Sequence, residues 1–165
     1  MDHEAFSGNT MLKLLESRVE PDWVDYNGHM NVAYYHMAFD RATDHFLDEL
    51  GLGEDYAKSG AGSMFALEDH ITYRRELRQG DPFRITLQLL DYDTKRIHYF
   101  LRMYHSELNA LVATCEHLSI YVDFGTRRSR PLPEAVRVEL AKLYERHHRF
   151  PRPEEAGRPI AIRRA

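Results

Sequence analysis

The chain has 165 residues, of which 43% are hydrophobic and 29% are charged, so we expect one globular domain over residues 1–165. A formal net charge of −4 argues against a general nucleic-acid-binding protein. No apolar stretch approaches the roughly 18 residues that a membrane-spanning helix needs, which argues against a membrane partner.

The first elements expected are an extended segment and a long helix. Residues 1–10 are polar and acidic, without the apolar core of a signal peptide. Pro21 places the extended segment 16–24 at a sheet edge or in a bend. Asn31 is a plausible N-cap and Gly51 a plausible stop for a helix of about 19 residues, which spans roughly 28 Å and can cross a sheet. Its apolar stripe recurs every three or four residues and consists of Val32, Tyr35, His36, Phe39, Thr43, Phe46, Leu47 and Leu50.

After residue 63 the hydrophobic period becomes that of strands. Apolar and polar residues alternate over 63–77, 83–89 and 97–104, and turns are expected at 79–82 and 91–95. The most apolar strand, 111–122, is expected at the centre of the sheet. Because short turns make consecutive strands antiparallel, we predict a four-stranded meander with the helix on one face, which is an α+β arrangement.

The single cysteine, Cys115, lies in this apolar strand. A lone thiol cannot form an internal disulfide, and its setting favours packing over nucleophilic chemistry. The cysteine content favours a reduced, cytoplasmic location.

The C-terminal part is expected to contain a basic loop at 125–133, a helix at 133–147 and an Arg- and Pro-rich surface arm at 149–165. His147 and His148 have no further ligands at metal-binding spacing. We therefore predict no metal site and place these histidines at the negative end of the helix dipole.

Two stretches carry a family resemblance. One reads Val24-Asp25-Tyr26-Asn27-Gly28-His29-Met30-Asn31-Val32-Ala33-Tyr34-Tyr35, and the other reads Tyr73-Arg74-Arg75-Glu76-Leu77-Arg78-Gln79-Gly80-Asp81. Together with the element order, they resemble hotdog-fold acyl-CoA thioesterases of the 4-hydroxybenzoyl-CoA thioesterase type over about residues 15–125. The resemblance implies an antiparallel sheet wrapped around one long central helix, with a C-terminal helix and basic tail at 133–165. It further implies a homodimer, or a tetramer of dimers, with active sites at the subunit interface.

The resemblance also implies a reaction. A small acyl-CoA would be hydrolysed without a further cofactor, because the CoA thioester is itself the substrate. The pattern Asp25-x-Asn27-x-His29 resembles the catalytic group of plant acyl-carrier-protein thioesterases. The run from Asp22 to Asn31 resembles the betainyl-CoA thioesterases of bacterial carnitine breakdown, which implies betainyl-CoA as the substrate.

The motif residues suit thioester hydrolysis. Asp25 precedes a helix, so its carboxylate lies near the positive end of the dipole and can act as base or nucleophile. First-turn amides from Met30 to Ala33 are candidate oxyanion donors, and Gly28 lets the backbone approach the substrate. Asn27 can orient water, and His29 can protonate the departing thiolate. Spacing alone favours an ordinary helix cap, and Asn31 keeps that structural role.

The expected binding residues surround this motif. Besides Gly28 and Met30, the acyl group would meet the aromatic residues Trp23, Tyr26, Tyr34, Phe65 and Tyr73. Aromatic faces attract a quaternary ammonium by about 0.5–2 kcal/mol per good contact. Guanidinium groups bind phosphate in a fork, so the CoA-binding candidates are Arg74, Arg75 and Arg128. Glu68 and Asp69 are expected to be solvated or ion-paired carboxylates.

Two alternatives remain at this point. Hotdog enoyl-CoA hydratases and dehydratases carry Asp-x-Asn-Pro-x-His, whereas His29 lies only four residues after Asp25 and the proline is absent, which argues against that reaction. A non-catalytic acyl-CoA-binding protein with the same fold stays open, because fold does not determine function.

Overall fold

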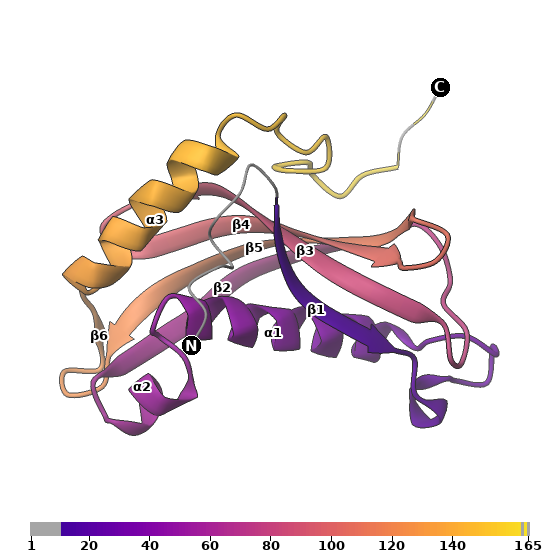
Figure 1. Ribbon diagram of the computed structural model, residues 1–165, viewed down its shortest axis with the longest axis horizontal. Coiled ribbons are helices and arrows are strands. Elements are labelled where there is room, and N and C mark those ends of the chain that lie inside the picture. The colour runs from indigo at the N-terminus through magenta and orange to yellow at the C-terminus, as the bar shows by residue number, and fades with distance from the viewer. Residues whose placement is uncertain (1–10, 163, 165) are drawn as a thin grey trace.

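Figure 1 shows a curled antiparallel sheet with helices on both of its faces, in a computed structural model that describes residues 11–162 and 164. The expected start at 1–10 lies outside the described residues. The strands are β1 (Leu12–Arg18), β2 (Gly62–Tyr73), β3 (Pro82–Tyr92), β4 (Arg96–His105), β5 (Ala110–Asp123) and β6 (Arg128–Ser129). The helices are η1 (Pro21–Trp23, a 3-10 turn), α1 (Val32–Glu49), α2 (Glu54–Lys58) and α3 (Glu134–His147).

The strand order is β1-β3-β4-β5-β2, with β6 attached to β5. The predicted meander is therefore wrong for its first pair: β2 pairs with β5, and β3 pairs with β1 and β4. The connection 74–81 must reach from β2 to β3, which lie three strand spacings, or roughly 14 Å, apart in the sheet. Its eight residues can span roughly 26 Å when extended, so they are long enough. It passes the start of α1, where Leu77 O accepts the Met30 N–H at 2.7 Å. The strand expected at the centre, β5, is an interior strand, while β4 occupies the middle of the order.

Helix α1 lies along the concave face of the sheet and confirms the expected helix (Figure 1). Asn31 Oδ1 accepts the Ala33 N–H at 3.0 Å, as expected of an N-cap, and Gly51 with a φ of +73° follows the last turn. The helix buries Tyr35, Ala38, Phe39, Ala42, Thr43 and Phe46. Two members of the predicted stripe are instead exposed, with 58% of Val32 and 57% of the His36 side chain accessible. Both lie on the flank that faces β2, the last strand in the order, so no further strand of the described residues covers them.

The opposite face of the sheet carries α3, which packs on β3. His147 is buried there, and its Nδ1 accepts the Leu89 N–H at 2.9 Å, so it ties α3 to the sheet rather than only serving the helix dipole. The segment after α3 crosses this same face instead of forming a free arm. Pro151 O accepts from Gln88 Nε2 at 3.2 Å, and the Gly157 N–H donates to Glu116 Oε2 at 2.7 Å.

Two short elements differ from the sequence expectation. The five-residue helix α2 is too short to show a helical period, and β6 lies inside the predicted basic loop. None of the described helices is both long and apolar enough to cross a membrane. The curled sheet around α1 confirms the predicted α+β hotdog arrangement.

Candidate active site

The loop before α1 folds back on itself and brings the motif residues together. Val24 and Met30 form an antiparallel bridge, the Asp25 N–H donates to His29 O at 3.2 Å, and the Gly28 N–H donates to Asp25 O at 2.9 Å. Gly28 has a φ of +80°, a conformation that strains residues with a side chain. The glycine therefore makes the tight loop possible, and Asn27 lies exposed at its tip.

The Asp25 carboxylate is held in place on both of its oxygens. Oδ1 accepts the Asn27 N–H at 2.8 Å, and Oδ2 accepts from Asn31 Nδ2 at 3.1 Å. Asn31 thus has two functions, because its Oδ1 caps α1 while its amide nitrogen orients Asp25. The sequence predicted the cap but not the contact with Asp25, which depends on the fold of the loop.

Most of the amides that were expected to be free at the start of α1 are already bonded. The Met30 N–H donates to Leu77 O, the Asn31 N–H to Trp23 O at 2.9 Å, and the Ala33 N–H to the cap. Of the amides from Met30 to Ala33, Val32 N–H is the one with no acceptor among the described residues. The expectation of several free donors is therefore corrected to one, since 74–81 and the turn at Trp23 occupy the others.

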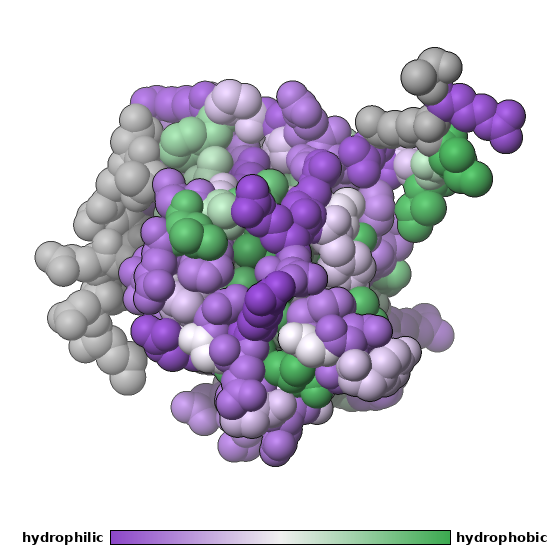
Figure 2. Space-filling model, turned by 90° about the vertical axis from the view of Figure 1, so that its right-hand side faces the viewer, coloured by the Kyte–Doolittle hydropathy of each residue, from purple (hydrophilic) through white to green (hydrophobic). Residues whose placement is uncertain are grey.

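A cavity of about 280 Å³ opens beside this amide. It is lined by His29, Met30, Val32, Tyr35, Tyr73, Arg74, Arg75 and Glu76. Tyr35 forms its base: the phenol donates to Arg75 O at 3.4 Å and accepts the Leu77 N–H at 3.1 Å. Burial raises the pKa of Tyr35, which keeps the phenol protonated as a donor. Figure 2 looks onto this end of the molecule and shows a mostly hydrophilic surface with small apolar patches.

The other predicted binding residues do not reach this cavity within one chain. Trp23 is buried and stacks on Tyr34 with ring centroids 5.6 Å apart, while Tyr26 is 97% exposed. Phe65 packs on Phe124. It lies eight residues before Tyr73 on β2, which is about 26 Å along the strand. Arg128 belongs to β6, which pairs with Asp123 and Val122 at that distant end of the sheet.

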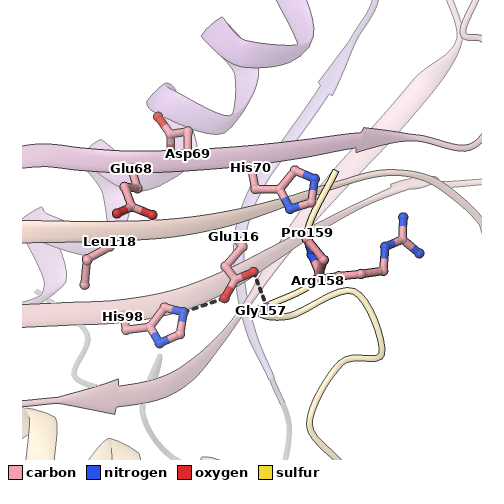
Figure 3. A pocket seen from close by; sticks show the side chains of 9 residues that line it. All are labelled: Glu68, Asp69, His70, His98, Glu116, Leu118, Gly157, Arg158 and Pro159. Atoms are coloured by element: carbon pink, nitrogen blue, oxygen red, sulfur yellow. Dashed lines mark hydrogen bonds and ion pairs between the residues drawn. The ribbon is translucent and has the colours of Figure 1, made fainter. Parts of the chain in front are cut away.

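A larger cavity of about 380 Å³ lies on the outer face of the sheet, under the C-terminal segment (Figure 3). Glu116 is central to it, bonded to His98 Nε2 at 2.7 Å and to the Gly157 amide. Glu68 points into this cavity, so its carboxylate is on the opposite side of the sheet from α1 (Figure 3). No motif residue lines this cavity, and among the described residues no group of His, Cys, Asp and Glu is arranged to hold a metal ion.

Residues 19–140 match the family profile of the thioesterase-like superfamily. The chain belongs to this superfamily. Among curated relatives, the thioesterase-like chain is 33% identical over 152 residues to a betainyl-CoA thioesterase of Pseudomonas aeruginosa, covering 92% of this chain and 96% of the relative. It is 35% identical over 153 residues to an L-carnitine dehydrogenase/betainyl-CoA thioesterase of Rhizobium meliloti, covering 93% of this chain. The match spans only 31% of that longer protein.

Solved structures agree with this family assignment. A hypothetical protein of Staphylococcus aureus, solved in complex with CoA, superposes with a TM-score of 0.86 at 32% identity, covering 93% of this chain and 97% of the other. A candidate thioesterase of Pseudomonas putida KT2440 superposes with a TM-score of 0.81 at 30% identity, covering 95% of this chain and all 100% of the other. The thioesterase-like fold therefore extends over nearly the whole chain.

Proposed function

We propose that this chain hydrolyses a small acyl-CoA thioester to the free acid and CoA, and that betainyl-CoA is its substrate. The observation that carries the proposal is the Asp25 carboxylate, which Asn27 and Asn31 hold in the loop before α1. Asp25 does not itself line the cavity at the start of α1, whereas His29, Met30 and Val32 of the same segment do. The superfamily membership and the betainyl-CoA thioesterases among the relatives support the reaction and the substrate. The CoA complex of the staphylococcal neighbour supports CoA as the carrier.

The chemistry follows from the groups at the start of α1. Asp25 acts as a base that takes a proton from water, or as a nucleophile that attacks the thioester carbon itself. The thioester oxygen, which becomes negative, accepts a hydrogen bond from Val32 N–H. The C–S bond then breaks, and His29, which lines the cavity, donates a proton to the departing thiolate. If Asp25 is the nucleophile, water next hydrolyses the anhydride formed on Asp25, which releases the acid and restores the carboxylate. No cofactor enters this scheme, because the thioester, water and the side chains of this chain supply all of the reacting atoms.

The CoA part is assigned to Arg74 and Arg75, which line the same cavity. Arg74 also forms an ion pair with Glu155 of the C-terminal segment. A phosphate that binds Arg74 therefore shares its guanidinium with Glu155 or displaces the Glu155 carboxylate. Arg75 is exposed and is the second guanidinium available beside the cavity. We place the protein in the cytoplasm as one hotdog domain that acts on a CoA ester.

A free-thiol assay across short, aromatic, long-chain and betainyl CoA esters tests the proposal. The expected result is CoA release, fastest from betainyl-CoA. Binding of these esters without release of CoA would favour a non-catalytic acyl-CoA-binding protein. Addition of water to an enoyl-CoA, without thiol release from the panel, would favour a hydratase.

Replacement of Asn31 separates capping from the orientation of Asp25. Asn31→Ala is expected to lower the free energy of unfolding by about 1 kcal/mol, because the cap on the Ala33 N–H is lost. Asn31→Asp keeps an acceptor for that cap but replaces the hydrogen bond to Asp25 with a second carboxylate, so CoA release slows and stability falls by at least the roughly 0.5–1.5 kcal/mol of that bond. Urea unfolding and the thiol assay measure the two effects. Wild-type turnover in Asn31→Asp would show that the Asn31–Asp25 contact has no catalytic role.

We further propose a homodimer formed through the free edge of β2. That edge exposes Phe65 (40%), Leu67 (50%) and Tyr73 (49%), and no described strand pairs with it. Antiparallel pairing of two copies along this edge would set the Phe65 end of β2 in one chain beside the Tyr73 end of β2 in the other. The assembly would thus bring Phe65 to a site from which it is remote in a single chain.

Leu67→Lys is expected to dissociate this dimer, because a charged side chain on a sheet edge opposes edge-to-edge pairing. Sedimentation velocity should show a dimer for the wild type and a monomer for the variant, with CoA release lowered in parallel. Val138→Lys, at a site 43% exposed on α3, is the matched control and should remain dimeric. A dimer that survives Leu67→Lys would place the interface elsewhere.

A further inference from the structure

A third, smaller cavity lies one helical turn beyond the candidate active site, between α1 and the inner face of β2, β4 and β5. Its volume is about 160 Å³, and Phe39, Leu101 and Ala66 contribute apolar surface to it. Sites for drug-sized ligands measure about 300–1,000 Å³, so this one suits a group of only a few heavy atoms. Neither the catalytic scheme nor the CoA assignment above uses this cavity.

Two carboxylates line this cavity, those of Asp40 and Asp69, and Asp69 is the one that hydrogen-bonds to other lining residues. His117 Nδ1 donates to its Oδ1, Cys115 Sγ donates to the same oxygen at 3.7 Å, and His36 Nε2 lies 3.4 Å from Oδ2. His117 is itself fixed, because its ring stacks on Tyr99 with centroids 4.8 Å apart. Asp69 also borders the outer cavity, but Figure 3 shows its side chain directed to the opposite side of β2 from Glu68, toward a helix.

Asp69 is a defined negative charge in a half-buried setting. Its side chain is 21% exposed. Burial opposes its ionisation, but the hydrogen bond and the charge of His117 outweigh that effect, so the pKa of Asp69 lies below its ordinary value. His36, which was expected in the core, is instead 57% exposed at the mouth of the cavity, where its pairing with Asp69 can be exchanged for another cation.

The two cavities are adjacent along α1. Val32 and Tyr35 line the candidate active site, whereas His36 and Phe39 line the small cavity. Val32 and His36 are one turn apart, about 6 Å along the helix axis. An acyl group whose charged end is one methylene from the thioester carbon can therefore start at Val32 N–H and end near Asp69.

We propose that the small cavity is the acyl subsite and that Asp69 selects acyl groups that carry a fixed positive charge, such as a trimethylammonium. This inference rests on the proposed function. A quaternary ammonium has no N–H to donate, so it needs a nearby negative charge and an apolar or aromatic wall rather than directed acceptors. Asp69 supplies the charge, and Phe39 with Leu101 supplies the wall. The histidines position the carboxylate and do not react.

The test compares betainyl-CoA with 3,3-dimethylbutanoyl-CoA, in which a carbon replaces the quaternary nitrogen with the shape unchanged. The wild type is expected to prefer the charged ester in kcat/KM by about 10- to 100-fold, as expected for a charge pair near a protein surface. Asp69→Asn is expected to remove most of this preference by slowing betainyl-CoA alone. Glu68→Gln is the matched control, since the neighbouring carboxylate faces the outer cavity, and it should keep the wild-type preference.

The outcomes separate this inference from the proposed function. Equal use of the two esters by the wild type overturns the role of Asp69 whether or not the variant folds, and leaves thioester hydrolysis in place. An equal loss for both esters in Asp69→Asn shows a merely structural residue and also overturns the inference. Thiol release from neither ester by the wild type overturns the proposed substrate itself.

Discussion

Asp25→Asn is expected to lower the rate of CoA release by about 10²–10⁴-fold, the range that a positioned base contributes. The amide can neither take a proton from water nor attack the thioester carbon. One carbonyl oxygen remains to accept the Asn27 N–H, so the loop keeps its shape. The lost acceptor for Asn31 Nδ2 should cost only about 0.5–1.5 kcal/mol of stability.

Three measurements make this prediction specific to Asp25. The thiol assay measures turnover, urea unfolding measures stability, and titration with a thioester substrate measures binding, which should persist in Asp25→Asn. Asp22→Asn is the matched control, because Asp22 is an exposed acid three residues earlier in η1. Turnover in Asp25→Asn within tenfold of wild type would remove Asp25 from the reaction.

Phe46→Ala is expected to have the largest effect on stability, about 3–5 kcal/mol. Phe46 is 0% exposed in the last half of α1, and its ring meets that of Tyr99 edge-on at 5.3 Å. Truncation removes this contact and leaves a cavity between the helix and β4. Tyr99 cannot readily move to fill the cavity, because its hydroxyl donates to Thr43 and its ring stacks on His117.

Urea unfolding at one fixed protein concentration measures this loss, since a dimer would make stability depend on concentration. Val138→Ala is the control: Val138 is 43% exposed on α3, so its truncation should change the free energy of unfolding by less than about 0.5 kcal/mol. A loss below about 1 kcal/mol in Phe46→Ala would mean that α1 is not anchored on the sheet at this point.

Local sequence signals predicted the elements well. Apolar residues spaced three and four apart, with Asn31 before them and Gly51 after them, predicted a long helix. The structure has this helix at Val32–Glu49. Alternation likewise led to β3 and β4 nearly at their observed limits. These signals succeed because capping, turns and side-chain alternation depend on residues close together in the chain.

The sequence did not predict how distant segments meet. Short turns suggested that β2 would pair with β3, yet β2 closes the sheet against β5, where Asp69 is paired with His117. The same crossover puts Leu77 O on the Met30 amide, and the Asn31 and Ala33 amides are bonded elsewhere, so Val32 N–H has no acceptor among the described residues. His36 was predicted to lie in the core because of its position on the helix. It is instead exposed, because the sheet ends at β2 beside it.

The sequence by itself determined the helix, its cap, most strands and the Asp25 motif, because each is encoded within a few neighbouring residues. Only the tertiary structure decided the strand order, the orientation of Asp25 by the capping residue and the pocket around Asp69. The physical reason is that those features arise where groups far apart in the chain satisfy one another's hydrogen bonds, such as Asp69 and His117, which are 48 residues apart.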